Sequence, residues 1–158
     1  MKELRQKFMQ TAIDLARKGM EDGTGGPFGC VIVKDGVIIA RGSNSVTSTN
    51  DPTAHAEVVA IRKACNALGT HQLTGCEIYT SCEPCPMCLG AIYWARPDKV
   101  FYACTKDDAA VAGFDDQFIY SELVIPYTER KIPMEQIGRS SSLEVFENWK
   151  DKEDRKDY

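Results

Sequence analysis

Two short stretches of the chain contain residues that could carry metal-dependent chemistry. "HAE" places His55 two residues before Glu57, and "PCPMC" places Cys85 three residues before Cys88. A catalytic zinc site uses three protein ligands drawn from His, Cys and carboxylate, and keeps a fourth position for water. His55, Cys85 and Cys88 supply such a set. The spacing therefore predicts one Zn²⁺ per chain.

Glu57 distinguishes a catalytic zinc site from a structural one. Zinc lowers the pKa of a bound water toward neutrality. A neighbouring carboxylate can then take a proton from that water and deliver it first to a ring nitrogen and later to the leaving group, so the set suits hydrolytic removal of an amine from an amidine-like carbon. The alternative is a closed structural zinc site, for which Cys82 is a candidate fourth ligand. Glu57 has no role in a closed site, which favours the catalytic interpretation.

These side chains must be positioned by the beginnings of two helices. Residues at i and i+3 share a helix face, so Cys85 and Cys88 can bind one ion, and Pro86 suits a helix start. His55 and Glu57 are two residues apart and point to opposite sides of a helix. They can share a target only if it lies off the helix end. The positive ends of both helix dipoles would favour thiolates there.

The surrounding pattern predicts an α/β domain. Apolar residues at helical spacing predict a first helix that ends near Gly19, and Asp35-Gly36 between two β-branched runs predicts a hairpin. A polar loop follows, after which Asp51 or Thr53 can cap a second helix that ends at Gly69. Strands over 76–81 and 99–105, and helices over 86–95 and 141–150, complete the pattern. The order ββαβαβ predicts helices packed on a mixed sheet.

Length, charge and cysteine content exclude several classes of protein. The 158 residues contain no repeat or linker and predict one domain. The net charge of −4 argues against a surface made to bind nucleic-acid backbones. No apolar run is long enough to cross a bilayer, and the first residues lack the apolar region of a signal peptide, so a soluble cytoplasmic protein is expected. Seven cysteines, an odd number, then suggest metal ligands and buried thiols rather than disulfides.

The H-x-E and P-C-x-x-C motifs form the signature of zinc-dependent nucleobase deaminases. The chain resembles the cytidine-deaminase-like superfamily and, within it, the short bacterial guanine deaminases. The closer similarity includes "GGPFG", "NDPTAHAEV", "TSCEPCPMCLGAIYWARP", "AGFDD" and the terminal tyrosine. The resemblance implies a three-layer αβα sandwich around a central five-stranded mixed sheet. It also implies a homodimer in which residues 150–158 are exchanged, so that each tail closes the active site of the partner.

By the same resemblance, guanine is hydrolysed to xanthine and ammonia, and Glu57 protonates N3 of the purine and then the departing amine. Asn44 matches a family asparagine that hydrogen-bonds the base, although an asparagine in a polar loop also suits a turn. Asp116 matches a family carboxylate that accepts guanine N–H groups. Its other interpretation is a cap for the helix-like "QFIYSEL". The choice of Asp116 over its neighbour Asp115 rests on the resemblance alone.

Three aromatic residues complete the predicted pocket. Phe28 could stack on the purine, and Trp94 could form a wall, although aromatic residues in a strand and a helix more often belong to the core. Composition alone would make Tyr158 the end of a solvated, charged tail. The resemblance instead makes Tyr158 a lid residue that reaches into the partner subunit and helps to exclude water.

Other activities share the zinc motif. A tRNA adenosine deaminase has the same ligands but must hold an anticodon loop, which calls for a basic surface that this acidic chain does not suggest. Cytosine, pterin or triazine amines are further candidate substrates, because the pocket walls rather than the zinc ligands choose the base. A non-catalytic zinc module is the alternative outside enzymes.

Overall fold

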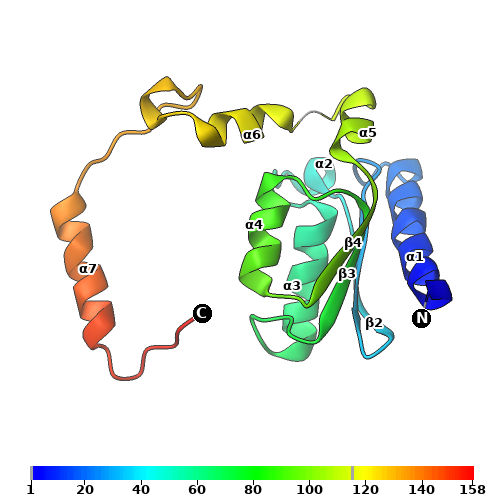
Figure 1. The fold of residues 1–158 in the computed structure, drawn as a ribbon, viewed down its shortest axis with the longest axis horizontal. Coiled ribbons are helices and arrows are strands. Elements are labelled where there is room, and N and C mark those ends of the chain that lie inside the picture. The colour runs from blue at the N-terminus through cyan, green and yellow to red at the C-terminus, as the bar shows by residue number, and fades with distance from the viewer. Residues whose placement is uncertain (1, 115) are drawn as a thin grey trace. The chain divides into compact units, whose positions relative to one another are not determined.

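The computed structural model of the protein describes residues 2–114 and 116–158 (Figure 1). The chain divides into two units, residues 1–117 and residues 118–158. In the described part of the chain, no helix is both long enough and apolar enough to span a membrane. The single domain predicted over residues 1–158 stays a prediction.

The sheet of the first unit starts with the predicted hairpin. Strands β1 (Gly29–Lys34) and β2 (Val37–Ser43) pair in antiparallel register. Asp35 and Gly36 join them with φ values of 50° and 76°. A two-residue turn of type I′ needs positive φ at both positions, which Asp-Gly adopts readily. The hairpin prediction is therefore confirmed.

Two more strands complete a mixed sheet. Strand β3 (Cys76–Cys82) pairs antiparallel with β1, and β4 (Lys99–Cys104) pairs parallel with β3, so the order is β2-β1-β3-β4. The mixed sheet is confirmed, but the expected fifth strand is wrong for the described residues. The reason lies at Thr105, where a capping box with Asp108 starts the helix α5 (Lys106–Val111) instead of another strand.

Helices cover both faces of this sheet (Figure 1). Helix α1 (Lys2–Glu21) lies on one face, where the Phe8 ring packs on Tyr79 with centroids 5.3 Å apart. Helices α3 (Ala56–Leu68) and α4 (Pro86–Ala95) lie on the other face. The core between these two helices and the sheet is made of small and β-branched side chains, which include Cys30, Ile32, Ala60, Ala64, Ile78 and Ile92.

Two glycines let the helices approach the hairpin strands closely. A Cβ on Gly29 would lie 2.2 Å from the backbone oxygen of Ala12 in α1. A Cβ on Gly42 would lie 2.2 Å from the backbone oxygen of Ala56, the first residue of α3. No side chain fits at such distances. Gly42 therefore fixes the place where the first turn of α3 rests on the sheet.

The loop before α3 differs from its prediction. Asp51 and Thr53 do not cap α3. Instead, Asp51 Oδ1 accepts hydrogen bonds from the backbone N–H of Thr53 at 2.8 Å and from its hydroxyl at 2.6 Å. These two side chains satisfy each other in a turn, so the helix begins later and His55 becomes its N-cap residue. A short helix, α2 (Val46–Thr49), also forms inside the stretch that was predicted to be a polar loop.

The second unit is helical. Helix α6 (Gln117–Val124) crosses the boundary between the units, the 3₁₀ turn η1 (Tyr127–Glu129) follows, and α7 (Arg139–Asp151) ends near the tail. Helix α7 confirms the helix predicted over 141–150. Residues 150–158 lie in this unit.

Candidate metal centre and active site

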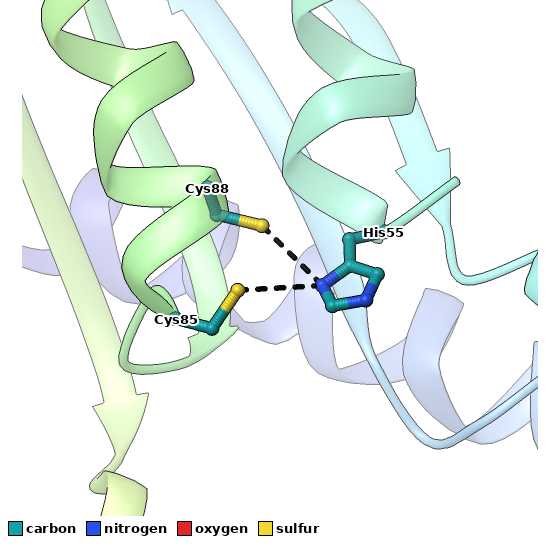
Figure 2. Close-up of side chains that lie close together, drawn as sticks. All are labelled: His55, Cys85 and Cys88. Carbon is teal, nitrogen blue, oxygen red and sulfur yellow. Dashed lines mark hydrogen bonds between the residues drawn. The ribbon is translucent and has the colours of Figure 1, made fainter. Parts of the chain in front are cut away.

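The three predicted zinc ligands meet where α3 and α4 begin. His55 is the N-cap of α3, Cys85 is the N-cap of α4, and Cys88 lies in the first turn of α4. His55 Nδ1 lies 3.5 Å from the sulfur of Cys85 and 3.5 Å from that of Cys88 (Figure 2). All three candidate ligand atoms lie within 4.8 Å of one another. Pro86 follows Cys85 at the first helical position, as its sequence position predicts.

These distances fit zinc. Zinc binds imidazole nitrogen at about 2.0–2.1 Å and thiolate sulfur at about 2.3 Å, so tetrahedral coordination separates N from S by about 3.5 Å. Both observed N–S distances have this value. Cys82, the candidate fourth ligand of a closed site, donates from its thiol to the backbone oxygen of Thr105 at 3.5 Å. The cluster found among the described residues is the three-ligand set of a catalytic site.

The electrostatics of the cluster favour a cation. Hydrogen bonds with Cys88 and, to a smaller extent, His55 outweigh burial and together lower the pKa of Cys85 to about 4. The pKa of Cys88 is raised, first by its hydrogen bond with Cys85 and then by burial. The pKa of His55 is raised by its hydrogen bond with Cys85. Cys85 is thus an anionic ligand at neutral pH, placed at a helix N-terminus that stabilises negative charge.

Glu57 lies beside the ligands without joining them. Its carboxyl group is buried, with only 6% of the residue exposed. Oε2 accepts a hydrogen bond from the Cys88 thiol at 3.4 Å, and Oε1 accepts one from the Thr80 hydroxyl at 3.1 Å. Burial is the main cause that raises the pKa of Glu57. A carboxyl group in this setting can hold a proton closer to neutral pH, as a general acid and base requires.

Comparison with known proteins agrees with this geometry. Residues 2–104 match the cytidine and deoxycytidylate deaminase zinc-binding region. The chain is 59% identical to the guanine deaminase of Bacillus subtilis over 97% of its own length and 98% of that protein. The crystal structure of that enzyme superposes with a TM-score of 0.95. The chain belongs to the zinc-dependent nucleobase deaminases, on the branch of the guanine deaminases. Zinc is its metal.

More distant deaminases share less of the chain. A guanine deaminase structure from Nitrosomonas europaea has 34% identity and a TM-score of 0.66, over 69% of this chain and 63% of that one. The tRNA-specific adenosine deaminase of Aquifex aeolicus is 43% identical over 63% of this chain and 65% of its own length. The zinc-binding region is thus shared by guanine deaminases and tRNA adenosine deaminases.

In this deaminase, Asn44 is buried just after β2. Its Oδ1 accepts hydrogen bonds from the backbone N–H groups of Gly26 at 3.2 Å and Val46 at 3.3 Å. A Cβ on Gly25 would lie 2.2 Å from the Asn44 backbone oxygen, so the glycine-rich turn packs directly on this residue. The backbone uses the amide oxygen, so the hydrogen-bonding capacity that Asn44 can offer a ligand is that of its NH₂ group. Asn44 can therefore offer donors to a substrate but not the acceptor that its residue type also suggested.

Phe28 has an aromatic partner that the sequence pattern did not single out. The rings of Phe28 and Phe114 meet edge to face, with centroids 4.9 Å apart. A Cβ on Gly26 would lie 3.3 Å from the Phe28 ring and 3.4 Å from the Phe114 ring. The feature of the sequence that could have identified this partner was the aromatic residue inside "AGFDD". Phe114 thus joins the segment before Asp116 to the start of β1.

Asp116 lies within electrostatic reach of the metal ligands, since its charge contributes to the raised pKa of His55. It also lines a cavity of about 290 Å³ with Lys106 and Gln117. Asp115, the alternative to Asp116, lies outside the described residues. Direct contact of Asp116 with a substrate stays a prediction.

Two predicted pocket residues remain, Trp94 and Tyr158. Trp94 is 62% exposed and lies six residues after Cys88, toward the other end of α4. Tyr158 belongs to the second unit, which the structure describes separately. The pocket wall and the lid therefore stay predictions.

Proposed function

We propose that this deaminase hydrolyses guanine to xanthine and ammonia. The observation that carries the proposal is the extent of the similarity to the Bacillus subtilis guanine deaminase. That match covers 153 residues, so it must include most of residues 118–158. The match to the tRNA-specific adenosine deaminase covers 99 residues, which is 63% of the chain. The higher identity, held over nearly the whole chain, therefore favours guanine over an anticodon loop.

The chain's own groups have separate tasks in this reaction. When bound by His55, Cys85 and Cys88, zinc lowers the pKa of a water and makes it a nucleophile at neutral pH. Glu57 takes one proton from the attacking water and delivers it to N3 of guanine. It then takes the second proton from the new hydroxyl group on C2 and gives it to the amine, which leaves as ammonia while C2 becomes a carbonyl. The Asn44 NH₂ group donates to an acceptor on the purine edge.

The pocket needs further residues on its other sides. Asp116 accepts hydrogen bonds from guanine N–H groups, because a carboxylate is an acceptor only. Phe28 stacks on the ring, and Trp94 forms a wall. The assignments of Phe28 and Asp116 are supported by the packing of Phe28 on Phe114 and by the charge of Asp116 near His55. That of Trp94 rests on the resemblance alone.

We further propose a homodimer in which residues 150–158 of each subunit close the partner's site, with Tyr158 as a lid. Exposed apolar side chains support this proposal, because contiguous apolar surface marks interaction sites. In the first unit they lie on α4 and β4, and in the second unit on α7: Leu89, Tyr93, Trp94, Tyr102, Leu143, Val145, Phe146 and Trp149. A cytoplasmic location also remains a prediction.

The substrate is tested by ammonia release from guanine, cytosine, adenine and a tRNA anticodon stem-loop, together with zinc content. Turnover of guanine with about one zinc per chain is expected. Glu57→Ala should abolish turnover while zinc stays bound. Zinc-loaded protein that releases ammonia only from another base would overturn the choice of guanine. Normal turnover by Glu57→Ala would overturn the mechanism.

The exchanged tail is tested by complementation. A chain that ends at Lys150 keeps the zinc cluster and lacks the tail, and Glu57→Ala keeps the tail and lacks the base. Each should be inactive alone. Co-expression of the two should restore activity, because the intact tail of the Glu57→Ala subunit closes the intact site of the truncated subunit. Full activity of the truncated chain by itself would refute the exchange.

A further inference from the structure

Thr80 is a polar residue at the centre of the sheet. It lies on β3, pairs in register with Cys30 of β1 and Tyr102 of β4, and is only 1% exposed. Its neighbours two residues away on the same face are Ile78 and Cys82. A hydroxyl group in such a place costs free energy unless it has a hydrogen-bond partner. If only packing in the sheet mattered, a valine at position 80 would fill the same space equally well.

The partner of this hydroxyl is the catalytic carboxyl group. Thr80 Oγ1 donates to Glu57 Oε1 at 3.1 Å, across 23 residues of sequence and in a buried setting. Threonine is β-branched and restricted at χ1, so its hydroxyl has little freedom to move away. Glu57 lies in the first turn of α3, and Thr80 lies on the central strand. The contact therefore connects the carboxyl group of Glu57 to the central strand of the sheet.

The two carboxyl oxygens of Glu57 are held differently. Oε2 accepts from the Cys88 thiol, but a cysteine that binds zinc does so as a thiolate and has no proton to donate. Thr80 donates to Oε1 whether or not Cys88 is a thiolate. The Glu57 backbone N–H also contributes a hydrogen bond. Thr80 is thus the side-chain donor to Glu57 that zinc binding does not remove.

We propose that Thr80 is a positioning residue for deamination. Its hydroxyl fixes the plane of the Glu57 carboxyl group, so that the other oxygen faces the water and the substrate nitrogen. Reactions that depend on proton transfer are sensitive to small errors in this geometry. The inference rests on the proposed acid–base role of Glu57. It adds a residue that touches neither zinc nor substrate.

The test compares Thr80→Val, which keeps the shape and loses the hydroxyl, with Thr80→Ser, which keeps the hydroxyl and loses a methyl group. Thr80→Val should lower kcat by about 10- to 100-fold, as changes behind a catalytic group typically do. KM and zinc content should stay close to wild type, and the melting temperature should fall no further than in the control Ser81→Ala. Thr80→Ser should recover most of kcat. If the Thr80 side chain only filled space, the order of the two variants would be reversed. Thr80→Ser would then be the more impaired, because serine leaves a cavity and valine does not.

Ser81 provides a matched control on the same strand. It is buried on the opposite face, where its Oγ accepts a hydrogen bond from the Gly29 backbone N–H at 3.0 Å. Ser81→Ala should lower the melting temperature and leave kcat within about twofold, because the lost hydrogen bond does not involve Glu57.

The outcomes separate the two proposals. If Glu57→Ala is inactive and Thr80→Val has normal kcat, the role of Thr80 is overturned and the mechanism stands. The same holds if Thr80→Ser is as slow as Thr80→Val. If Glu57→Ala is fully active, both proposals fail together. Loss of zinc from Thr80→Val in proportion to its loss of kcat would also overturn positioning, since the defect would then lie in metal binding.

Discussion

His55 and Cys85 occupy the same position on two different helices. Each is an N-cap residue with extended backbone, and His55 Nδ1 lies 3.5 Å from Cys85 Sγ. Neither side chain makes a capping hydrogen bond to its own helix. The two side chains point toward each other instead (Figure 2). The first-turn residues Glu57 and Cys88 then reach the same space. Two helix N-termini therefore bring the three candidate zinc ligands and the Glu57 carboxyl group to one place of positive potential.

Removal of a ligand should release the metal. His55→Ala, Cys85→Ala and Cys88→Ala are each expected to purify with less than about a tenth of a zinc per chain, because two remaining ligands do not hold a catalytic zinc. Metal content by atomic spectroscopy is the measurement. Cys82→Ala is the matched control and should keep its zinc, because the Cys82 thiol contacts a backbone oxygen instead. Zinc loss from Cys82→Ala would revive the closed structural site.

Chelated protein should reveal an unusually acidic thiol. With the pKa of Cys85 lowered to about 4, its thiolate predominates above that pH. The rate of its alkylation by iodoacetamide should therefore change little between pH 5.5 and 7.5. For a free thiol with a pKa near 8.5, the rate would rise about 100-fold over the same range. Peptide mass spectrometry after timed labelling measures the rate. Cys85→Ser should remove this pH-independent fraction. A rate that rises about tenfold per pH unit would contradict the prediction.

Gly25→Ala should damage the substrate pocket without affecting the metal. The new Cβ would lie 2.2 Å from the Asn44 backbone oxygen and 2.5 Å from its Oδ1, so the asparagine must shift. We expect kcat/KM for guanine to fall by at least about tenfold, with zinc retained. Gly19→Ala is the control, because its Cβ would meet Ser43 at an ordinary 3.4 Å. Equal activity of both variants would show that the position of Asn44 does not matter.

The turn before α3 should make stability depend on acid pH. The pKa of Asp51 is lowered, first by the hydrogen bond from the Thr53 hydroxyl and then by that from the Thr53 backbone N–H. A depressed pKa contributes stability that is complete above the unfolded value near 3.8 and is lost as pH falls through the folded value. Asp51→Asn should therefore melt about 2 °C below wild type from pH 5 to 8. As the pH falls below the unfolded value near 3.8, the difference should shrink, as calorimetry in matched buffers can show. A difference that stays constant down to the pH at which folded Asp51 is protonated would exclude this origin.

Much of the fold and of the metal site was predictable from local patterns. The Asp35-Gly36 turn, the helix over 86–95 and the strand over 76–81 each follow from residues that are neighbours in sequence. The metal ligands were also predictable, because His55, Glu57 and the two cysteines have spacings that suit few other purposes. These signals come from residues that are close in the sequence, so they set the local backbone conformation in any tertiary context.

The tertiary structure decided what depends on contacts between distant segments. The amide oxygen of Asn44 is occupied by Gly26, which lies 18 residues away, so only its donors remain for a ligand. The Thr80 hydroxyl finds Glu57 across 23 residues, a pairing that no pattern in either segment reveals. The sequence by itself therefore determined which residues are the candidate zinc ligands and the chemistry they allow. Only the packing of the sheet against α3 and α4 decided how the Glu57 carboxyl group is held, because hydrogen-bond partners in a buried site are set by three-dimensional proximity.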